Sequence, residues 1–321
     1  MRTSPAFELP PDRAKANNRA IRLEWISVGY LITAIFFIYI TLGSSQAMKA
    51  AWFEDILSLV PPIAFLIASR TRHRPPNHRY PHGYHRSVSI AFLVAGLALF
   101  SMGLFILYDS LSMLLAFEHA PIGVVQPWGE PIWLGWFMIP ALIYSAVPAM
   151  ILGRLKLPLA HFLHDKVLFA DAQMNKADWL TAVAAMVGVV GIGFGIWWLD
   201  GLAAIIISLD IARDGATNLR AAIADLMDAR PTLVDNSALD PLSERLRTEV
   251  CSLSWVTDAV VRVRDEGHVF FADIQLVPKT SEDLLTKIGE AEKQLLGIDW
   301  RLHDIVIMPA AEIGGGGADT E

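Results

Sequence analysis

The chain of 321 residues has a mean hydropathy of +0.42, and 54% of its residues are hydrophobic. The apolar residues gather in blocks of helical length, which is typical of an integral membrane protein and excludes a soluble domain of ordinary composition. The net charge is −7, and no basic stripe interleaved with aromatic residues indicates a nucleic-acid partner. The single cysteine, Cys251, excludes an intrachain disulfide and a thiolate-based zinc or iron–sulfur site.

Residues 1–22 carry prolines, charged residues and asparagines without an apolar core, and we interpret them as a polar N-terminal tail rather than a signal peptide. Six apolar runs follow, each long enough to cross the lipid bilayer as a helix. They cover residues 23–43, 46–70, 87–116, 131–153, 161–195 and 197–226. The predicted membrane domain therefore spans residues 23–226.

The charged residues of the short loops predict the orientation. The loop after the second run, RTRHRPPNHRYPHGYHR, is strongly basic, whereas the loop after the third run, EHAPIGVVQPWGEP, contains neither Lys nor Arg. Because Lys and Arg are enriched on the cytoplasmic side of membranes, we expect the basic loop and both termini to be cytoplasmic. We expect the protein to reside in the inner, or plasma, membrane.

The composition changes to that of a soluble protein after about residue 230. Residues 227–239 are interpreted as a linker with a helix-stopping proline, and residues 240–310 as a small cytosolic α+β domain. Residues 311–321 include four successive glycines and are expected to be a disordered tail.

Periodicity predicts the elements of this second domain in the order αββαβ. The first helix is expected over residues 240–252 and the second over residues 281–296. The segments DAVVRVRD and VFFADIQLV alternate as two strands of a hairpin that turns at Glu266-Gly267, and HDIVIM is the third strand.

Polar side chains inside the predicted spans are candidates for a functional site, because an ionised group at the bilayer centre is costly and is kept mainly where it has a function. Glu54 and Asp55 lie near the middle of the second span. Pro61-Pro62 follows one to two turns later and is expected to interrupt the helical hydrogen bonds. The resulting kink is expected to line a cavity.

The fifth span carries a polar helix face. Asp171, Asn175 and Asp178 are spaced i, i+4 and i+7, and Met174 lies on the neighbouring stripe. Carboxylate and amide oxygens are ligands for hard cations, and a thioether can add a weak ligand for a borderline cation. The predicted metal-site residues are Glu54, Asp55, Asp171, Met174, Asn175 and Asp178.

Simpler interpretations stay open for several residues. The acids of the fifth span could instead make interhelical hydrogen bonds or pair with Lys176 and Lys49, and Met174 could be ordinary packing in a buried helix. Four acids nearer the span ends are expected at interfaces or in helix pairs rather than as ligands: Glu24, Asp109, Asp200 and Asp210. Four loop histidines could hold a metal or, among prolines, form part of an anchor for anionic lipid: His73, His78, His82 and His85.

Three motifs resemble the cation diffusion facilitators, a family of proton-coupled divalent-metal exporters. ADAQMNKAD is similar to the family's fifth-span pattern, YPHGYHR to its cytosolic loop, and WWLDGLAAIIISLDI to the opening of its sixth span. The resemblance implies six transmembrane helices, a ferredoxin-like (metallochaperone-like) cytosolic domain and a homodimer formed through that domain. It also implies export of a divalent cation (zinc, manganese, iron or cobalt) against protons, with no permanently bound cofactor and no enzymatic activity.

The chain departs from the family's ligand pattern, which takes two residues spaced i, i+4 from each of the second and fifth spans. Asp55 and Asp178 match the second member of each pair, whereas Ala51 and Met174 stand at the first. In the cytosolic domain, the positions of the family's metal-binding histidines hold Ala259, Gln275 and Met308. Two functions stay open: a cation/proton antiporter with a rebuilt site, and a transport-inactive member that acts as a dimerisation partner or scaffold.

Overall fold

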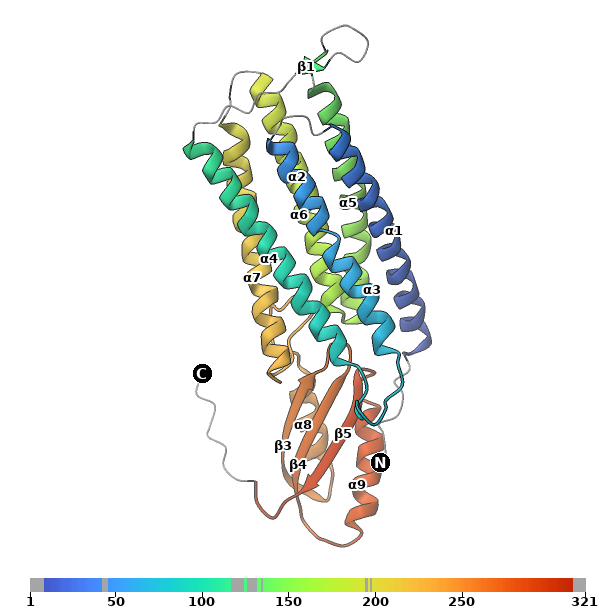
Figure 1. The fold of residues 1–321 in the computed structure, drawn as a ribbon. Coiled ribbons are helices and arrows are strands. Elements are labelled where there is room, and N and C mark those ends of the chain that lie inside the picture. The colour runs from blue at the N-terminus through green and yellow to red at the C-terminus, as the bar shows by residue number, and fades with distance from the viewer. Residues whose placement is uncertain are drawn as a thin grey trace.

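The computed structural model describes residues 9–41, 46–116, 124–125, 132–133, 135–193, 196 and 198–313. Within these residues, seven helices form an elongated bundle, and a three-stranded sheet with two further helices lies at one end of it (Figure 1). The bundle helices are α1 (Pro11–Thr41), α2 (Gln46–Leu57), α3 (Val60–Arg72), α4 (Arg86–Leu115), α5 (Gly135–Leu163), α6 (Lys166–Gly193) and α7 (Leu199–Leu226). At the opposite end, two short strands pair antiparallel, β1 (Val124–Val125) and β2 (Ile132–Trp133).

Four stretches of the described chain are long and apolar enough to cross a membrane. They are Pro11–Thr41, Trp52–Arg72, Arg86–Leu115 and Gly135–Leu163. The helices α6 and α7 are each 28 residues long, but α6 carries four charged residues in its first half and α7 carries charged residues along its length. The structure thus agrees with an α-helical membrane domain, while the crossing of the bilayer by six helices stays a prediction.

The first helix starts earlier than predicted, at Pro11 instead of residue 23. Proline is favoured in the first turn of a helix because its missing N–H is not needed there, and an acidic residue, Asp12, follows it. Asn17 and Ala20 are buried against the bundle, so this polar segment extends the helix and has a packed face.

The predicted loop between the fourth and fifth spans, residues 154–160, is wrong, because α5 continues through Pro158 to Leu163. The chain turns instead at His164, which has a positive φ of 50°. Asp165 then caps α6, since its Oδ1 accepts hydrogen bonds of 3.1 Å from the backbone N–H groups of Val167 and Leu168.

The predicted interruption of the second span is confirmed. The helix α2 ends at Leu57, and α3 begins at Val60. Pro61 and Pro62 have no backbone N–H, so they cannot donate to the carbonyl groups four residues before them. The break leaves Glu54 and Asp55 on the last turn of α2.

Within the bundle, α4 packs along α7, α5 packs along α6, and α1 packs against α5 (Figure 1). The α4–α7 contact is close enough to require glycine: a Cβ atom on Gly215 would lie 2.4 Å from the backbone nitrogen of Phe100. The largest side chains of the core are almost fully buried, and they include Phe65, Phe92 and Leu168. This packing places α2, α4, α5 and α6 around a common interior.

The C-terminal domain has the predicted αββαβ order, and its hairpin turns at Glu266-Gly267 as predicted. In the sheet order β3-β4-β5, β3 and β4 run antiparallel, whereas β4 and β5 run parallel. The elements are α8 (Leu242–Ser252), β3 (Val256–Asp265), β4 (Phe270–Pro278), α9 (Leu284–Leu296) and β5 (Leu302–Pro309). The assignment to the ferredoxin-like fold stays a prediction.

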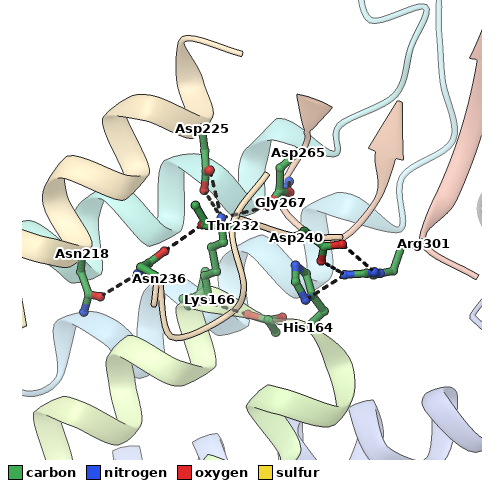
Figure 2. Close-up of polar contacts among 12 residues, drawn as sticks. His164, Lys166, Asn218, Asp225, Thr232, Asn236, Asp240, Asp265, Gly267 and Arg301 are labelled. Carbon is green, nitrogen blue, oxygen red and sulfur yellow. Dashed lines mark hydrogen bonds and ion pairs between the residues drawn. The ribbon is translucent and has the colours of Figure 1, made fainter. Parts of the chain in front are cut away.

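Buried ion pairs join this domain to the bundle at the turn between α5 and α6 (Figure 2). The Nζ of Lys166 lies 2.7 Å from Oδ2 of Asp225 on α7 and 3.1 Å from Oδ2 of Asp265 at the end of β3. Arg301 contacts both Asp240, at 2.6 Å, and Nδ1 of His164, at 3.2 Å. The domain is therefore held against one end of the membrane helices by charge-assisted contacts.

Candidate functional site

The side chains of Asp55 and Asp178 come together where α2 ends beside α6. Each is 5% exposed, although they come from opposite halves of the chain. The hydroxyl group of Ser58, in the break between α2 and α3, donates a 2.6 Å hydrogen bond to Oδ1 of Asp178. The interruption by the two prolines thus supplies a donor for the carboxylate of the neighbouring helix.

These two acids line a small cavity of about 70 Å³ inside the bundle. Its polar lining comes from four helices and consists of Glu54, Asp55, Asp109, Ser110, Ser145, Asp178 and Thr181. A volume of this size can hold an ion with a few water molecules. The carboxylate and hydroxyl oxygens are the type of ligand that hard divalent cations prefer.

Asp55 has an oxygen available for a ligand. The hydroxyl group of Ser145 hydrogen-bonds this carboxyl group, and the hydroxyl group of Tyr30 donates to the Ser145 backbone carbonyl. The other oxygen, Asp55 Oδ2, is buried and has no hydrogen-bond partner among the residues that the structure describes. A buried carboxylate oxygen without a donor is costly unless a cation or a proton occupies it.

Asp109 lines the cavity, although its place in the sequence predicts an interface or helix-pairing residue. It lies in α4 next to Ser110, and both line the cavity. The sequence feature that could have indicated a cavity residue is the polar pair Asp109-Ser110 within the apolar segment FILYDSLSMLL. That segment lies near the end of the predicted span, which favoured an interface position for Asp109. Ser145 and Thr181 were also missed, since hydroxyl groups in apolar helices usually bond their own backbone.

Asp171 and Asn175 share a helix face with Asp178 by their spacing, but they lie in a different cluster. Asp171 forms an ion pair with Lys156 of α5, and the Asn175 side chain donates a 2.8 Å hydrogen bond to the Asp171 carbonyl. Asp171 and Asp178 thus both make the interhelical hydrogen bonds of the alternative interpretation, to Lys156 and Ser58, whereas Lys176 pairs with Asp210 at 3.0 Å. The side chain of Lys49 lies outside the described residues.

Met174 does not line the cavity. It is 1% exposed and packs in an apolar cluster with Leu99, Met102 and Ala177. The interpretation as packing therefore describes its surroundings better than the interpretation as a ligand. The side chain of Ala51, at the other departure from the family pattern, lies outside the described residues.

The four loop histidines are not brought together. His73, His78 and His82 are exposed, whereas His85 is buried beneath the C-terminal sheet. The His85 ring centroid lies 5.2 Å from that of His268 and 4.7 Å from that of His303. Burial, with further contributions from His303 and Arg72, lowers the pKa of His85 to about 4.

Among the residues that the structure describes, a preassembled set of metal ligands is not found. Across the part of the chain that the structure describes, no three His, Cys, Asp or Glu side chains are grouped closely enough to hold a metal ion. The cavity lining offers the carboxyl groups of Glu54, Asp55, Asp109 and Asp178 together with hydroxyl groups, which are the kind of oxygen ligand that hard cations bind.

Several known proteins are similar in sequence to this chain. The chain is 23% identical over 284 residues to the manganese efflux system protein MneS of Bacillus subtilis (strain 168), covering 86% of this chain and 90% of that protein. It is 25% identical over 198 residues to the magnetosome protein MamB of Magnetospira sp. (strain QH-2), which covers 62% of each chain. It is 24% identical over 196 residues to metal tolerance protein 11 of Arabidopsis thaliana, covering 61% of this chain and 47% of that protein.

The family profile described as the cation efflux transmembrane domain matches residues 24–227. This range contains most of α1 and all of α2 to α7, including both acids of the cavity. Because the match covers well over half of its length, this chain belongs to the cation efflux, or cation diffusion facilitator, family as a divergent member.

Proposed function

We propose that this protein exports a divalent metal cation through the cavity between Asp55 and Asp178, in exchange for protons. The observation that carries the proposal is the convergence of these two acids, from α2 and α6, on one small buried cavity. Two carboxylates can balance the charge of a dication, whereas their burial without a cation would be costly. Membership of a cation efflux family agrees with this role.

Manganese is the cation that we favour among zinc, manganese, iron and cobalt. The cavity offers carboxylate and hydroxyl oxygens, which suit manganese better than the softer sulfur and imidazole ligands do. The relative with the longest shared region among those described above is named a manganese efflux system protein.

Proton exchange follows from the same chemistry. When the cation leaves, the two buried acids lose the charge that balanced them, and protons from the release side can replace it. The cation then binds again only when the acids lose those protons. Alternation between these two states couples cation efflux to proton influx.

The proposed topology places the C-terminal domain and both termini in the cytoplasm of a cell with an inner membrane, and six helices across that membrane. The start of α1, the basic loop before α4 and the C-terminal sheet all lie at the same end of the bundle (Figure 1). We further propose a homodimer through the C-terminal domain, where Val306 and Met308 of the edge strand β5 are exposed apolar residues.

Transport by the purified full-length protein in liposomes tests the proposal. Uptake of manganese, zinc, iron and cobalt is measured with and without a pH gradient. We expect uptake that depends on the pH gradient and is fastest for manganese. Asp55→Asn and Asp178→Asn should each abolish this uptake, because each change removes one charge while the shape of the side chain stays nearly the same. The matched control is Asp210→Asn, which alters an exposed acid paired with Lys176.

A transport-inactive scaffold is the second candidate function. It is favoured by the observation that no three metal-binding side chains are grouped within the described residues. In that case the liposomes take up none of the four metals, and the three Asp→Asn variants behave as the unaltered protein does. Uptake that persists in both cavity variants would instead place the cation site elsewhere.

A further inference from the structure

A second buried charge cluster lies in the bundle, and the proposed cation cavity does not use it. It joins Glu24 of α1, Lys156 of α5 and Asp171 of α6. The Nζ of Lys156 lies 2.9 Å from Oε2 of Glu24 and also forms an ion pair with Oδ2 of Asp171. The exposed fractions are 0% for Glu24, 0% for Lys156 and 1% for Asp171.

The cluster contains one basic and two acidic groups. The charged groups that face Lys156 are Glu24 and Asp171, and Arg72 of the adjacent helix α3 is instead bound by Asn17 and Asp165. If both acids were ionised, one negative charge would remain uncompensated in a site without solvent contact. A buried acid in that position binds a proton instead, because the desolvation of an unpaired charge costs more.

The individual oxygen atoms give independent support. Glu24 Oε1 is buried and has no hydrogen-bond partner in the described part of the chain. The carboxyl groups of Glu24 and Asp171 both contact the same atom, Nζ of Lys156, so the two acids lie side by side. Two carboxyl groups can share a hydrogen bond only if one of them carries a proton, because ionised carboxylates have no donor.

We propose that Glu24, Lys156 and Asp171 form a binding site for one exchangeable proton, held by the two carboxyl groups and separate from the cation cavity. Binding converts one carboxylate to a carboxylic acid with a proton taken from water, and release returns that proton to water. Asp171 precedes Asp178 by seven residues, or about 10 Å along α6. The binding of the proton stands on the geometry alone, whereas its role in exchange rests on the proposed antiport.

Polar side chains recur along α1 between the level of this site and the level of the cavity. On the buried face of α1, Ser27 follows Glu24 by one turn, and its hydroxyl group is buried. One turn further, the Tyr30 hydroxyl group donates to the carbonyl of Ser145, which lines the cavity. The proton site therefore lies between the end of the bundle that carries the C-terminal domain and the cation cavity.

Infrared spectroscopy of the full-length protein in lipid bilayers tests the inference, through the carbonyl band of protonated carboxyl groups at about pH 7, well above the ordinary pKa of a carboxyl group. We expect Glu24→Gln and Asp171→Asn each to lower the band by one carboxyl group, because the remaining acid pairs one-to-one with Lys156 and is ionised. Lys156→Met should raise the band by one carboxyl group, since both acids then lack a cation. Asp210→Asn is the control and should leave the band unchanged.

An equal band in Glu24→Gln, Asp171→Asn and the unaltered protein would overturn the inference. If the variants do not fold, the test uses the unaltered protein with isotope labels at its glutamate and aspartate carboxyl groups. The absence of any protonated carboxyl group at about pH 7 in a titration of that protein also overturns the inference. The readout does not depend on transport. If the band changes as expected while Asp55→Asn and Asp178→Asn leave uptake intact, the proposed cation site fails and the proton site stands.

Discussion

The Ser58 hydroxyl group donates a 2.6 Å hydrogen bond to Oδ1 of Asp178, a residue 120 positions later in the chain. Ser58 lies in the break between α2 and α3, where the backbone no longer forms a continuous helix. The irregular segment thereby orients an acid on α6 toward the cavity that Asp55 also lines. A hydrogen bond to a charged group is worth more than one between neutral groups, so this contact is expected to affect cation binding.

Ser58→Ala should weaken cation binding without abolishing transport. The loss of a hydrogen bond to an ionised group, about 1.5 kcal/mol or more, corresponds to about a tenfold rise in the KM for the cation. Uptake by liposomes over a range of manganese concentrations measures this change. Ser112→Ala is the control, because Ser112 is exposed and bonds the Asp109 carbonyl. An unchanged KM in Ser58→Ala would show that Ser58 does not contribute to cation binding.

Met174→His should destabilise the protein rather than turn its selectivity toward zinc. Sequence comparison with the family pattern favours a gain of zinc affinity, but the Met174 side chain packs among Leu99, Met102 and Ala177. An imidazole placed there loses hydrogen bonds to water, at a cost of about 1–3 kcal/mol. Thermal unfolding in detergent should show a lower midpoint for Met174→His and a smaller change for Met174→Leu. A large rise in zinc uptake would show that this helix face turns toward the cation.

Acid should loosen the contact of the C-terminal domain with the bundle. Burial lowers the pKa of His85 to about 4 and the pKa of His268 well below its ordinary value. Since the unfolded chain then binds more protons than the folded one, stability should fall as the pH decreases from about 6.5 toward about 4. His85→Gln should reduce this fall in the melting midpoint, whereas His78→Gln, at an exposed position, should not. If the melting midpoint falls with decreasing pH to the same extent in both variants, His85 is not the group responsible for the loss of stability.

A reporter cysteine at Asn77 should be labelled from the cytoplasm only. Asn77 is exposed in the loop between α3 and α4, at the same end of the bundle as the C-terminal domain. The native Cys251 is exposed as well, so the experiment requires Cys251→Ser in the same chain. Intact cells treated with an impermeant thiol reagent should leave Asn77→Cys unmodified until the membrane is opened. Labelling of Asn77→Cys in intact cells would show that this loop faces the outside, contrary to the proposed topology.

Local sequence patterns were sufficient for several elements. The αββαβ order follows from alternating and helical periodicities that short segments carry on their own, and Glu266-Gly267 supplies the hairpin turn. The break after Leu57 follows from Pro61 and Pro62, which lack the N–H groups that a continuous helix needs. Asp55 and Asp178 stood out as acids in apolar helices, and both line the cavity.

Tertiary packing decided which polar groups meet. Helical spacing places Asp171, Asn175 and Asp178 on one face, but one face of α6 contacts different neighbours along its length. Asp171 therefore faces Lys156, and Asp178 faces Ser58. The sequence by itself determined the αββαβ order, the break after Leu57 and the burial of Asp55 and Asp178, because those properties depend on neighbouring residues and on hydrophobicity. Only the tertiary structure decided that Asp109 lines the cavity, that Met174 is packing and that Glu24 pairs with Lys156, because these contacts depend on how helices distant in sequence are rotated against one another.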